Sequence, residues 1–94
     1  MKVMAIGTLE SLSLEQQQSF MPREVPATLQ VYLDGKIEQF WLRDEMKGPI
    51  FLMEVESLQE ASDILEALPL GKAKLLSFEL MPIGPLSPLG LLIQ

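Results

Sequence analysis

Short apolar runs bounded by polar or turn-forming residues alternate along the chain with two longer helical patterns. Residues 2–8 (KVMAIGT) form an apolar run with the length of a buried strand. Residues 36–43 (KIEQFWLR) and 49–56 (PIFLMEVE) predict two more strands, joined by a hairpin loop over residues 44–48. A last strand is predicted over residues 74–81 (KLLSFELM), ahead of a segment rich in Pro, Gly and Leu.

The first helical pattern begins at Ser13, where S-L-E-Q has the spacing of a capping box. A proline inside a helix costs about 3 kcal/mol or more, because it removes a hydrogen bond and clashes with the preceding turn. We therefore expect a break near residues 20–21, a restart at Pro22 and a bend at Pro26. Apolar residues at helical spacing then lead to Gly35, which suits a left-handed helix end; they are Met21, Val25, Leu29, Tyr32 and Leu33.

The second helical pattern begins at Ser57, which forms S-x-x-E with Glu60, and is closed by Pro69. Its apolar stripe consists of Leu58, Ala61, Ile64, Leu65 and Leu68. The predicted order is therefore strand, helix, strand, strand, helix, strand. This order is typical of the α+β, ferredoxin-like βαββαβ fold, with a four-stranded antiparallel sheet and both helices on one of its faces.

Side chains alternate along a strand, so each predicted strand presents two different faces. The wholly apolar sets of the third and fourth strands are expected to pack on the helices: Phe51, Met53, Val55, Leu76, Phe78 and Leu80. In the second strand we expect Phe40 and Leu42 to join them. The opposite set is then Ile37, Gln39, Trp41 and Arg43, although Ile37 and Trp41 fit the core equally well by pattern.

The face turned away from the helices would expose more contiguous apolar area than a monomer usually does. Its apolar members are Ile37, Trp41, Ile50, Leu52, Leu75 and Met81. Two copies packed face to face would bury them and enclose Gln39, Arg43, Glu54, Ser77 and Glu79. We therefore expect a homodimer, in which two sheets pair as a dimeric α/β barrel, or a ring of such dimers.

The composition excludes several kinds of site. The 94 residues include no Cys and no His, which removes disulfides, zinc fingers, thiol nucleophiles and histidine-ligated metals; we expect neither a cofactor nor a metal. A net charge of −6 disfavours nucleic acid and anionic membrane surfaces as partners. No uncharged stretch reaches the ~20 residues of a membrane span and no signal peptide is evident, so we expect a cytoplasmic protein.

The length indicates one domain, which we place at residues 1–83. Residues 84–94 form a tail rich in Pro, Gly and Leu, which we expect to pack on a neighbouring subunit.

The order of elements and two segments resemble the muconolactone isomerase family of dimeric α/β barrels. The segments are D-G-K-I-E-Q-F-W-L-R at residues 34–43 and E-A-L-P-L at residues 66–70. The resemblance implies a cofactor-free allylic proton shift on an unsaturated lactone, in a pocket formed within the oligomer. It places Glu24 at the carboxylate of the family's first helix and Trp41 at its strand tryptophan. Gln39 stands where the family carries a histidine, so an imidazole-dependent step is unavailable and we expect a divergent member.

Glu54 and Glu79 are the candidate proton carriers, because a carboxylate enclosed between two sheets loses hydration and its pKa rises. Glu24 joins them if the proline bend turns it toward a pocket. Arg43 is a candidate anchor for a ligand carboxylate, since its guanidinium can bind both oxygens. The other candidate substrate-binding residues are Trp41, Gln39 and Tyr32.

The leading hypothesis is a homo-oligomeric protein that binds a small hydrophobic acid or lactone and moves a proton on it without a cofactor. A non-catalytic ligand-sensing or assembly module is the first alternative, because the mixed face could serve only as an interface. A cofactor-free monooxygenase of related architecture is the second. RNA binding is disfavoured, because the predicted sheet lacks a paired aromatic platform and the charge has the wrong sign.

Overall fold

The computed structural model of the chain describes residues 1–84, apart from the side chain of Met46. The four strands form one antiparallel sheet in the order β2-β3-β1-β4. In chain order the elements are β1 (Lys2–Leu9), α1 (Leu14–Leu33), β2 (Ile37–Leu42), a 3-10 turn (Asp44–Met46), β3 (Pro49–Glu54), α2 (Leu58–Ala67), α3 (Pro69–Lys72) and β4 (Leu76–Ile83).

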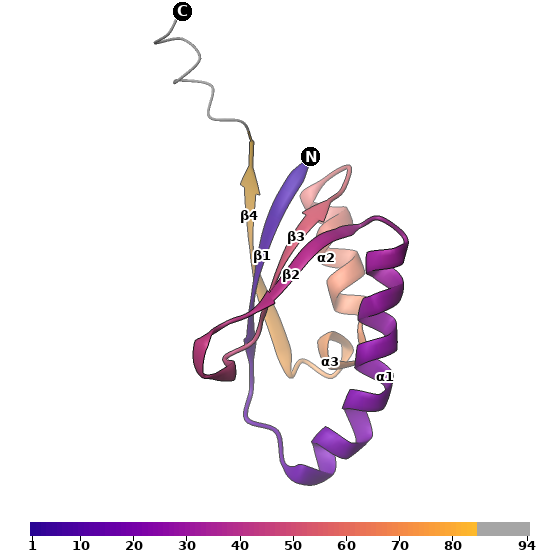
Figure 1. Cartoon of the computed structure of the whole chain (residues 1–94), viewed down its shortest axis with the longest axis vertical. Coiled ribbons are helices and arrows are strands. Elements are labelled where there is room, and N and C mark those ends of the chain that lie inside the picture. Colours follow the sequence, from indigo (N-terminus) through magenta and orange to yellow (C-terminus); the bar gives the residue numbers. More distant parts are fainter. Residues whose placement is uncertain (85–94) are drawn as a thin grey trace, which may run out of the picture.

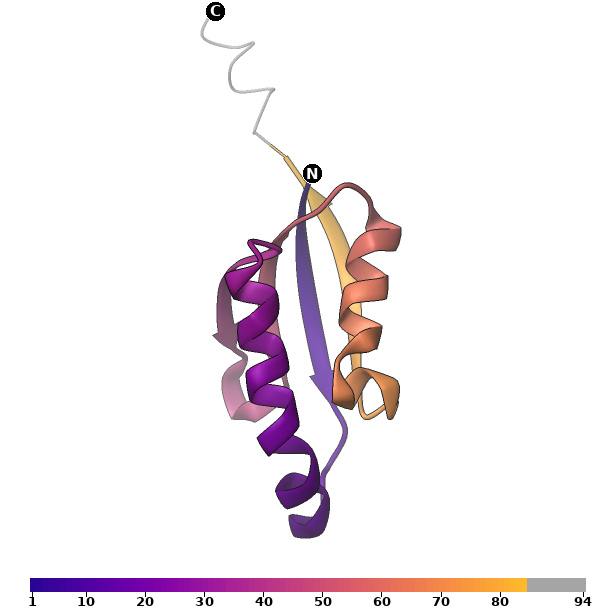
Figure 2. The same cartoon turned by 90° about the vertical axis from the view of Figure 1, so that its right-hand side faces the viewer.

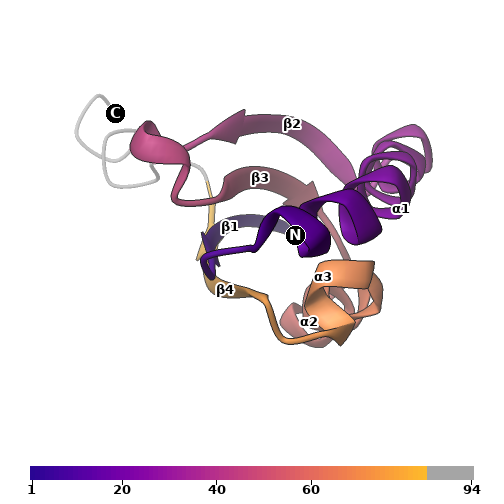
Figure 3. The same ribbon diagram turned by 90° about the horizontal axis from the view of Figure 1, so that it is seen from below.

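The helices all cover one face of the sheet, as Figures 1 and 2 show from two sides. Seen along the strands in Figure 3, the sheet curves around them and its opposite face carries no described element. The predicted α+β, ferredoxin-like arrangement is confirmed. Of the tail predicted over residues 84–94, all but Gly84 lies outside the described residues.

Helix α1 begins with the predicted capping box. The Ser13 hydroxyl accepts the Gln16 N–H at 3.1 Å, and the Gln16 side chain accepts the Ser13 N–H at 2.9 Å. The helix ends at Asp34, and Gly35 follows with φ 81°, a left-handed conformation that glycine adopts without a steric penalty. Both ends of this helix are therefore set by local sequence.

The predicted break in this helix is wrong, because α1 runs without interruption through Pro22 and Pro26. The two prolines are four residues apart, so they lie on the same side of the helix, and both are exposed. The backbone groups that lose their helical partners therefore face water, which can hydrate them. Water on that side makes the two prolines tolerable within one helix.

The apolar residues noted at helical spacing in α1 do not form the side that faces the sheet. They are largely exposed: Val25 at 52%, Leu29 at 46% and Leu33 at 74%. The side turned inward instead carries Glu24, Ala27 and Val31, of which the two apolar residues pack against the core. A carboxylate thus occupies a position where the spacing would ordinarily place an apolar side chain.

Helix α2 begins at the predicted cap, where the Ser57 hydroxyl accepts the Glu60 N–H at 3.1 Å. The Glu60 carboxylate does not close a capping box but accepts from the Lys36 ammonium at 2.9 Å. Pro69 ends α2 as predicted and also opens the short helix α3, where proline is tolerated in the first turn. This one-turn helix was not predicted.

The two faces of the sheet follow the predicted alternation, with one correction in β2. Phe40 pairs with Phe51 on the helix side, and Trp41 pairs with Ile50 on the bare side, as expected. Ile37, however, pairs with Met53 on the helix side and is 1% exposed. A bulge between Ile37 and Gln39 adds one residue to β2, so the alternation reverses there and Ile37 joins the core.

The core lies between the sheet and the helices, and Phe51 stacks on Phe78 within it at a ring separation of 5.5 Å. Among the described residues, no helix combines the length and the apolar character that crossing a bilayer requires. The buried core members are Val3, Ala5, Ile37, Phe51, Met53, Val55, Ala61, Leu65 and Leu68.

Candidate functional site

The residues proposed from sequence lie on two opposite sides of the sheet. Gln39, Trp41, Arg43, Glu54 and Glu79 belong to the bare face. Glu24 and Tyr32 come from α1, on the helix side. The structure therefore does not bring all the candidates together.

The bare face is built from side chains aligned across the four strands. One row runs Trp41, Ile50, Ile6 and Glu79, and the next runs Gln39, Leu52, Met4 and Met81. Trp41 is 47% exposed and Met81 is 46% exposed. An apolar strip with a polar residue at one end of each row thus lies open across the sheet.

Arg43 is engaged within the chain. Its Nη1 atom donates to the Gly7 carbonyl at 2.9 Å and to the Thr8 hydroxyl at 3.3 Å. Because Gly7 and Thr8 belong to β1, these bonds tie the end of β2 to the middle of the sheet. This guanidinium therefore has a structural role in the described chain.

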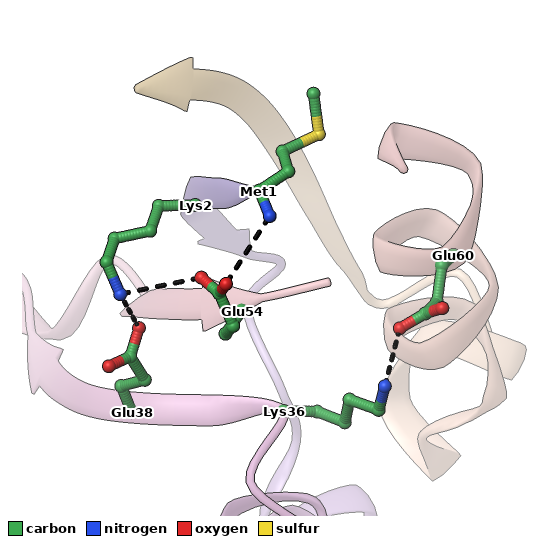
Figure 4. A network of polar contacts seen from close by, with 6 residues as sticks. All are labelled: Met1, Lys2, Lys36, Glu38, Glu54 and Glu60. Carbon is green, nitrogen blue, oxygen red and sulfur yellow. Dashed lines mark hydrogen bonds and ion pairs between the residues drawn. The ribbon is translucent and has the colours of Figure 1, made fainter. Parts of the chain in front are cut away.

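Glu54 lies at the edge of the bare face in a group of ion pairs, which Figure 4 shows. Its carboxylate lies 3.4 Å from the amino terminus at Met1 and 3.4 Å from Lys2 Nζ, which also pairs with Glu38. Partial desolvation favours a higher pKa, but the two ammonium groups outweigh it and hold the pKa of Glu54 below its ordinary value. In the single chain this is opposite to the direction expected of an enclosed proton carrier.

The neighbouring cations show the reciprocal effect. The hydrogen bond from Glu38 raises the pKa of Lys2, and the hydrogen bond from Glu60 raises the pKa of Lys36. Both ammonium groups are therefore charged at neutral pH. Glu79, the other proposed carrier, is exposed on β4 opposite Ile6.

A cavity of about 360 Å³ lies on the helix side, between α1, the sheet and α3. Its volume is within the range of small-molecule sites, which is roughly 300–1,000 Å³. Nearly all of its walls are apolar. The lining residues are Leu9, Met21, Glu24, Val25, Thr28, Leu29, Phe40, Leu42, Gly48, Pro49, Phe51, Leu70 and Leu76.

Glu24 is the only charged residue of this lining, and it is 7% exposed. One carboxylate oxygen, Oε1, accepts the Leu70 backbone N–H at 2.9 Å. The other, Oε2, accepts the Thr28 hydroxyl at 3.4 Å. A buried carboxylate needs such donors, because without hydrogen bonds the free-energy cost of removing it from water is not offset.

The sequence explains how this carboxylate is held. The first N–H groups of a helix have no partner within the helix, and Pro69 places the Leu70 N–H in that position at the start of α3. Glu24 supplies the missing acceptor from a segment 46 residues away. Oε1 is thus fixed by the backbone, while Oε2 is held only by the longer bond from Thr28.

The cavity opens to solvent along the edge between α1 and β2. Val25, Leu29, Phe40 and Leu42 line it there and are each 46–61% exposed. Tyr32 packs edge-on against Phe40, with ring centroids 5.5 Å apart, but does not line the cavity. Tyr32 therefore packs behind this wall and is not among the residues that line the cavity.

A second hollow, of about 490 Å³, shares Leu9 and Met21 with the cavity and is more polar. Gln17, Glu45 and Lys47 line it, and Lys47 pairs with Glu45 at 3.8 Å. Lys47, next in sequence to the cavity residue Gly48, thus lines the outer hollow and not the cavity. In the part of the chain that the structure describes, no group of three acidic side chains is arranged to hold a metal ion.

The sequence indicated Glu24 as a candidate but did not predict the cavity around it. One indication was available: Glu24, Ala27 and Val31 have the spacing of a single helix face, which places the carboxylate inward. The other walls come from the hairpin and from α3, which are distant in sequence from Glu24, and no local pattern predicts their meeting.

No family model matches the chain, and no curated protein matches it either. A solved structure is similar: a 5-chloro-2-hydroxyhydroquinone dehydrochlorinase from Burkholderia phenoliruptrix AC1100, in complex with 2,5-dihydroxybenzoquinone. It superposes with a TM-score of 0.71 at 19% sequence identity, over 89% of this chain and 94% of that chain. The two chains share the ferredoxin-like fold. At this identity the likeness concerns the fold alone.

Proposed function

We propose that the chain binds a small, largely apolar organic molecule in the cavity between α1 and the sheet, with Glu24 as the group that accepts its proton. The observation that carries this proposal is the isolated carboxylate in an apolar cavity of about 360 Å³. A buried charge is costly, and a cavity with few, well-placed polar groups is typical of ligand sites. Capping α3 uses only one acceptor oxygen of Glu24, so the second oxygen, held by the longer bond from Thr28, is available to a ligand.

The chemistry that this arrangement supports is a proton shift without a cofactor. Glu24 Oε2 takes a proton from an acidic C–H or O–H of the ligand, whose electron pair moves into the adjacent unsaturated system. The same carboxylic acid then returns the proton at another atom, so no electrons are gained or lost. The Leu70 N–H on Oε1 stays in place throughout and orients the carboxylate for both steps.

Two likenesses support this proposal. The segments at residues 34–43 and 66–70 resemble muconolactone isomerases, whose reaction is a proton shift of this kind. The dehydrochlorinase of similar fold was solved in complex with 2,5-dihydroxybenzoquinone, a small ring compound. The proposal moves the proposed base from Glu54 and Glu79 to Glu24, because Glu24 is the one of these three that lines the apolar cavity.

We also propose that the chain forms a homodimer through its bare sheet face. The rows through Trp41 and Met4 expose an apolar strip across all four strands, of a kind that monomers usually cover. Two such faces packed together would give the dimeric α/β barrel expected from sequence. The cavity lies on the other side of the sheet, so dimer formation leaves it accessible.

The test is a titration of the ¹⁵N-labelled chain with 4-methylphenol, a small apolar ring with one hydroxyl group. Leu29→Trp is designed to fill the cavity mouth, and Leu33→Trp adds the same ring to an exposed position of α1 that does not line the cavity. We expect Leu29→Trp to weaken binding at least tenfold and Leu33→Trp to leave it unchanged. Equal binding by both variants would show that the ligand lies elsewhere.

Glu24→Gln tests the acid–base role, with Glu15→Gln as the matched control on the same helix, since Glu15 is exposed. The amide oxygen of Gln still accepts the Leu70 N–H but cannot take up a proton. Exchange of the ligand's acidic C–H with D₂O, followed on a cyclic enone, should fall at least a hundredfold in Glu24→Gln only. The same loss in both variants would refute a specific role for Glu24.

A further inference from the structure

The lining of the cavity carries a negatively charged side chain and no positively charged one. Glu24 is the single ionisable group of its lining, and none of the seven Lys and Arg side chains of the sequence is among the lining residues. Arg43 is bonded to β1 on the other side of the sheet, and Arg23 lies against the Phe20 ring at 5.0 Å. Lys47 lines only the outer hollow. A ligand inside the cavity therefore meets one negative charge and no compensating positive one.

This arrangement is unfavourable for a carboxylate ligand. An anion would have to leave water for apolar walls, and its charge would then lie close to that of Glu24. Like charges repel more strongly where water is excluded. The expectation from sequence, a hydrophobic acid anchored by Arg43, does not fit this cavity.

A cation is also a poor fit, because the cavity offers too few hydrogen-bond acceptors for an ammonium group. An ammonium group has three N–H donors and is strongly hydrated. Of the two carboxylate oxygens, Oε1 is already held by Leu70 at 2.9 Å, and the Thr28 hydroxyl is the other polar side-chain group of the lining. A ligand with one hydroxyl donor, by contrast, can be satisfied by Oε2 alone.

We propose that the cavity selects uncharged ligands that present a hydroxyl group to Glu24, namely phenols, enols or alcohols, and rejects carboxylates. The inference rests on the proposed function, since it concerns the ligand of the same cavity. It names Glu24 as the specificity-determining residue, with Oε2 as the acceptor. Apolar walls fix the rest of the ligand by shape.

The experiment compares three molecules of nearly equal size and different charge at pH 7: benzyl alcohol, benzoate and benzylammonium. Each is titrated into the full chain at constant ionic strength, and binding is read from the amide shifts of cavity residues. We expect benzyl alcohol to bind at least tenfold more tightly than benzoate, and more tightly than benzylammonium. Benzoate binding equal to that of the alcohol, or tighter binding of benzylammonium, would overturn the inference.

Glu24→Gln removes the like charge at nearly constant volume, so the gap between benzoate and benzyl alcohol should narrow at least threefold, while the cost of desolvating benzoate remains. Glu15→Gln should leave the discrimination unchanged. In the wild-type chain, 1 M NaCl should leave most of the gap between benzoate and the alcohol, because salt screens a buried charge much less than an exposed one. A gap that closes in salt, or one that is unchanged in Glu24→Gln, would overturn the inference. If none of the three molecules shifts a cavity amide, the proposed function fails as well.

Discussion

The backbone of α2 leaves no room for a side chain at Gly71, and this makes Gly71→Ala a sharp test of how the cavity is built. An added Cβ would lie well inside van der Waals contact of the Leu65 carbonyl oxygen. It would also lie 3.2 Å from Glu66 Cα and 3.3 Å from the Leu65 carbonyl carbon. These atoms belong to the backbone of a helix and cannot rotate away, so α3 itself must move.

Two effects of opposite sign decide how much stability Gly71→Ala loses. Alanine in place of a helical glycine stabilises by roughly 0.5–1 kcal/mol, because the unfolded chain loses freedom. Overpacking costs roughly 1–3 kcal/mol, and obstruction by backbone atoms points to the upper part of that range. We therefore expect Gly71→Ala to lower the free energy of unfolding by about 1–2 kcal/mol.

The consequence for the cavity follows from the adjacent residue. Leu70 donates its N–H to Glu24 at 2.9 Å, and a shift of α3 lengthens this bond. Urea unfolding followed by Trp41 fluorescence measures the stability, at one fixed protein concentration. Gly84→Ala is the control, since nothing lies within 4 Å of its added Cβ. A Gly71→Ala chain as stable as the wild type, with an unshifted Leu70 amide resonance, would refute this view of α3.

Three further predictions concern the helix caps, the ion pairs and the bare face. Ser13→Ala and Ser57→Ala should each lower the free energy of unfolding by about 1 kcal/mol, and a change below 0.3 kcal/mol in urea unfolding would contradict the capping geometry. The pKa of Glu54 is lowered from 4.5 by its ammonium partners, so its stabilising effect is present above pH 4.5 and is lost as the pH falls through the folded-state value. Glu54→Gln should therefore be less stable than wild type at pH 7 and match it near pH 2; a difference that persists in acid would contradict the assignment. Trp41→Lys should convert a dimer to a monomer in sedimentation analysis, whereas Leu14→Lys, at a position 70% exposed on α1, should not; an unchanged dimer in both would place the interface elsewhere.

Much of the fold could be predicted from sequence because its elements are specified locally. Ser13 and Ser57 both cap helices in the structure, and Pro69 ends α2. The alternation of β3 and β4 correctly assigned the helix-side set, including Phe51 and Phe78. These features depend on neighbours within a few residues, which a sequence displays directly.

The errors have physical causes that a sequence displays only indirectly. The bulge after Ile37 shifts the alternation by one residue, and nothing in KIEQFWLR marks its position. The prolines of α1 appear disruptive until both are seen to face water. The side of α1 that faces the sheet is hard to identify from the sequence because it contains Glu24, whose burial depends on Leu70, 46 residues away.

The candidate site, like the fold, could be predicted only in part from the sequence. Glu24 could be proposed from its place in the chain, whereas the cavity needs α1, the hairpin and α3 to meet. Glu54 and Glu79 were proposed on the assumption that two sheets enclose them, a condition that depends on a second copy. The cavity is formed by long-range contacts, so the sequence indicates it only through Glu24, an acidic residue among apolar ones.

The central claim is that a small ligand binds on the helix side of the sheet, against Glu24. The amide resonance of Leu70 tests it most directly, because this N–H donates to the carboxylate that would contact the ligand. In a ¹H–¹⁵N titration with 4-methylphenol we predict the largest shifts at Leu70, Thr28 and Gly48, with Trp41 and Glu79 unaffected. Shifts confined to Trp41, Met4 and Glu79, with Leu70 unchanged, would place the ligand on the bare face and contradict the account.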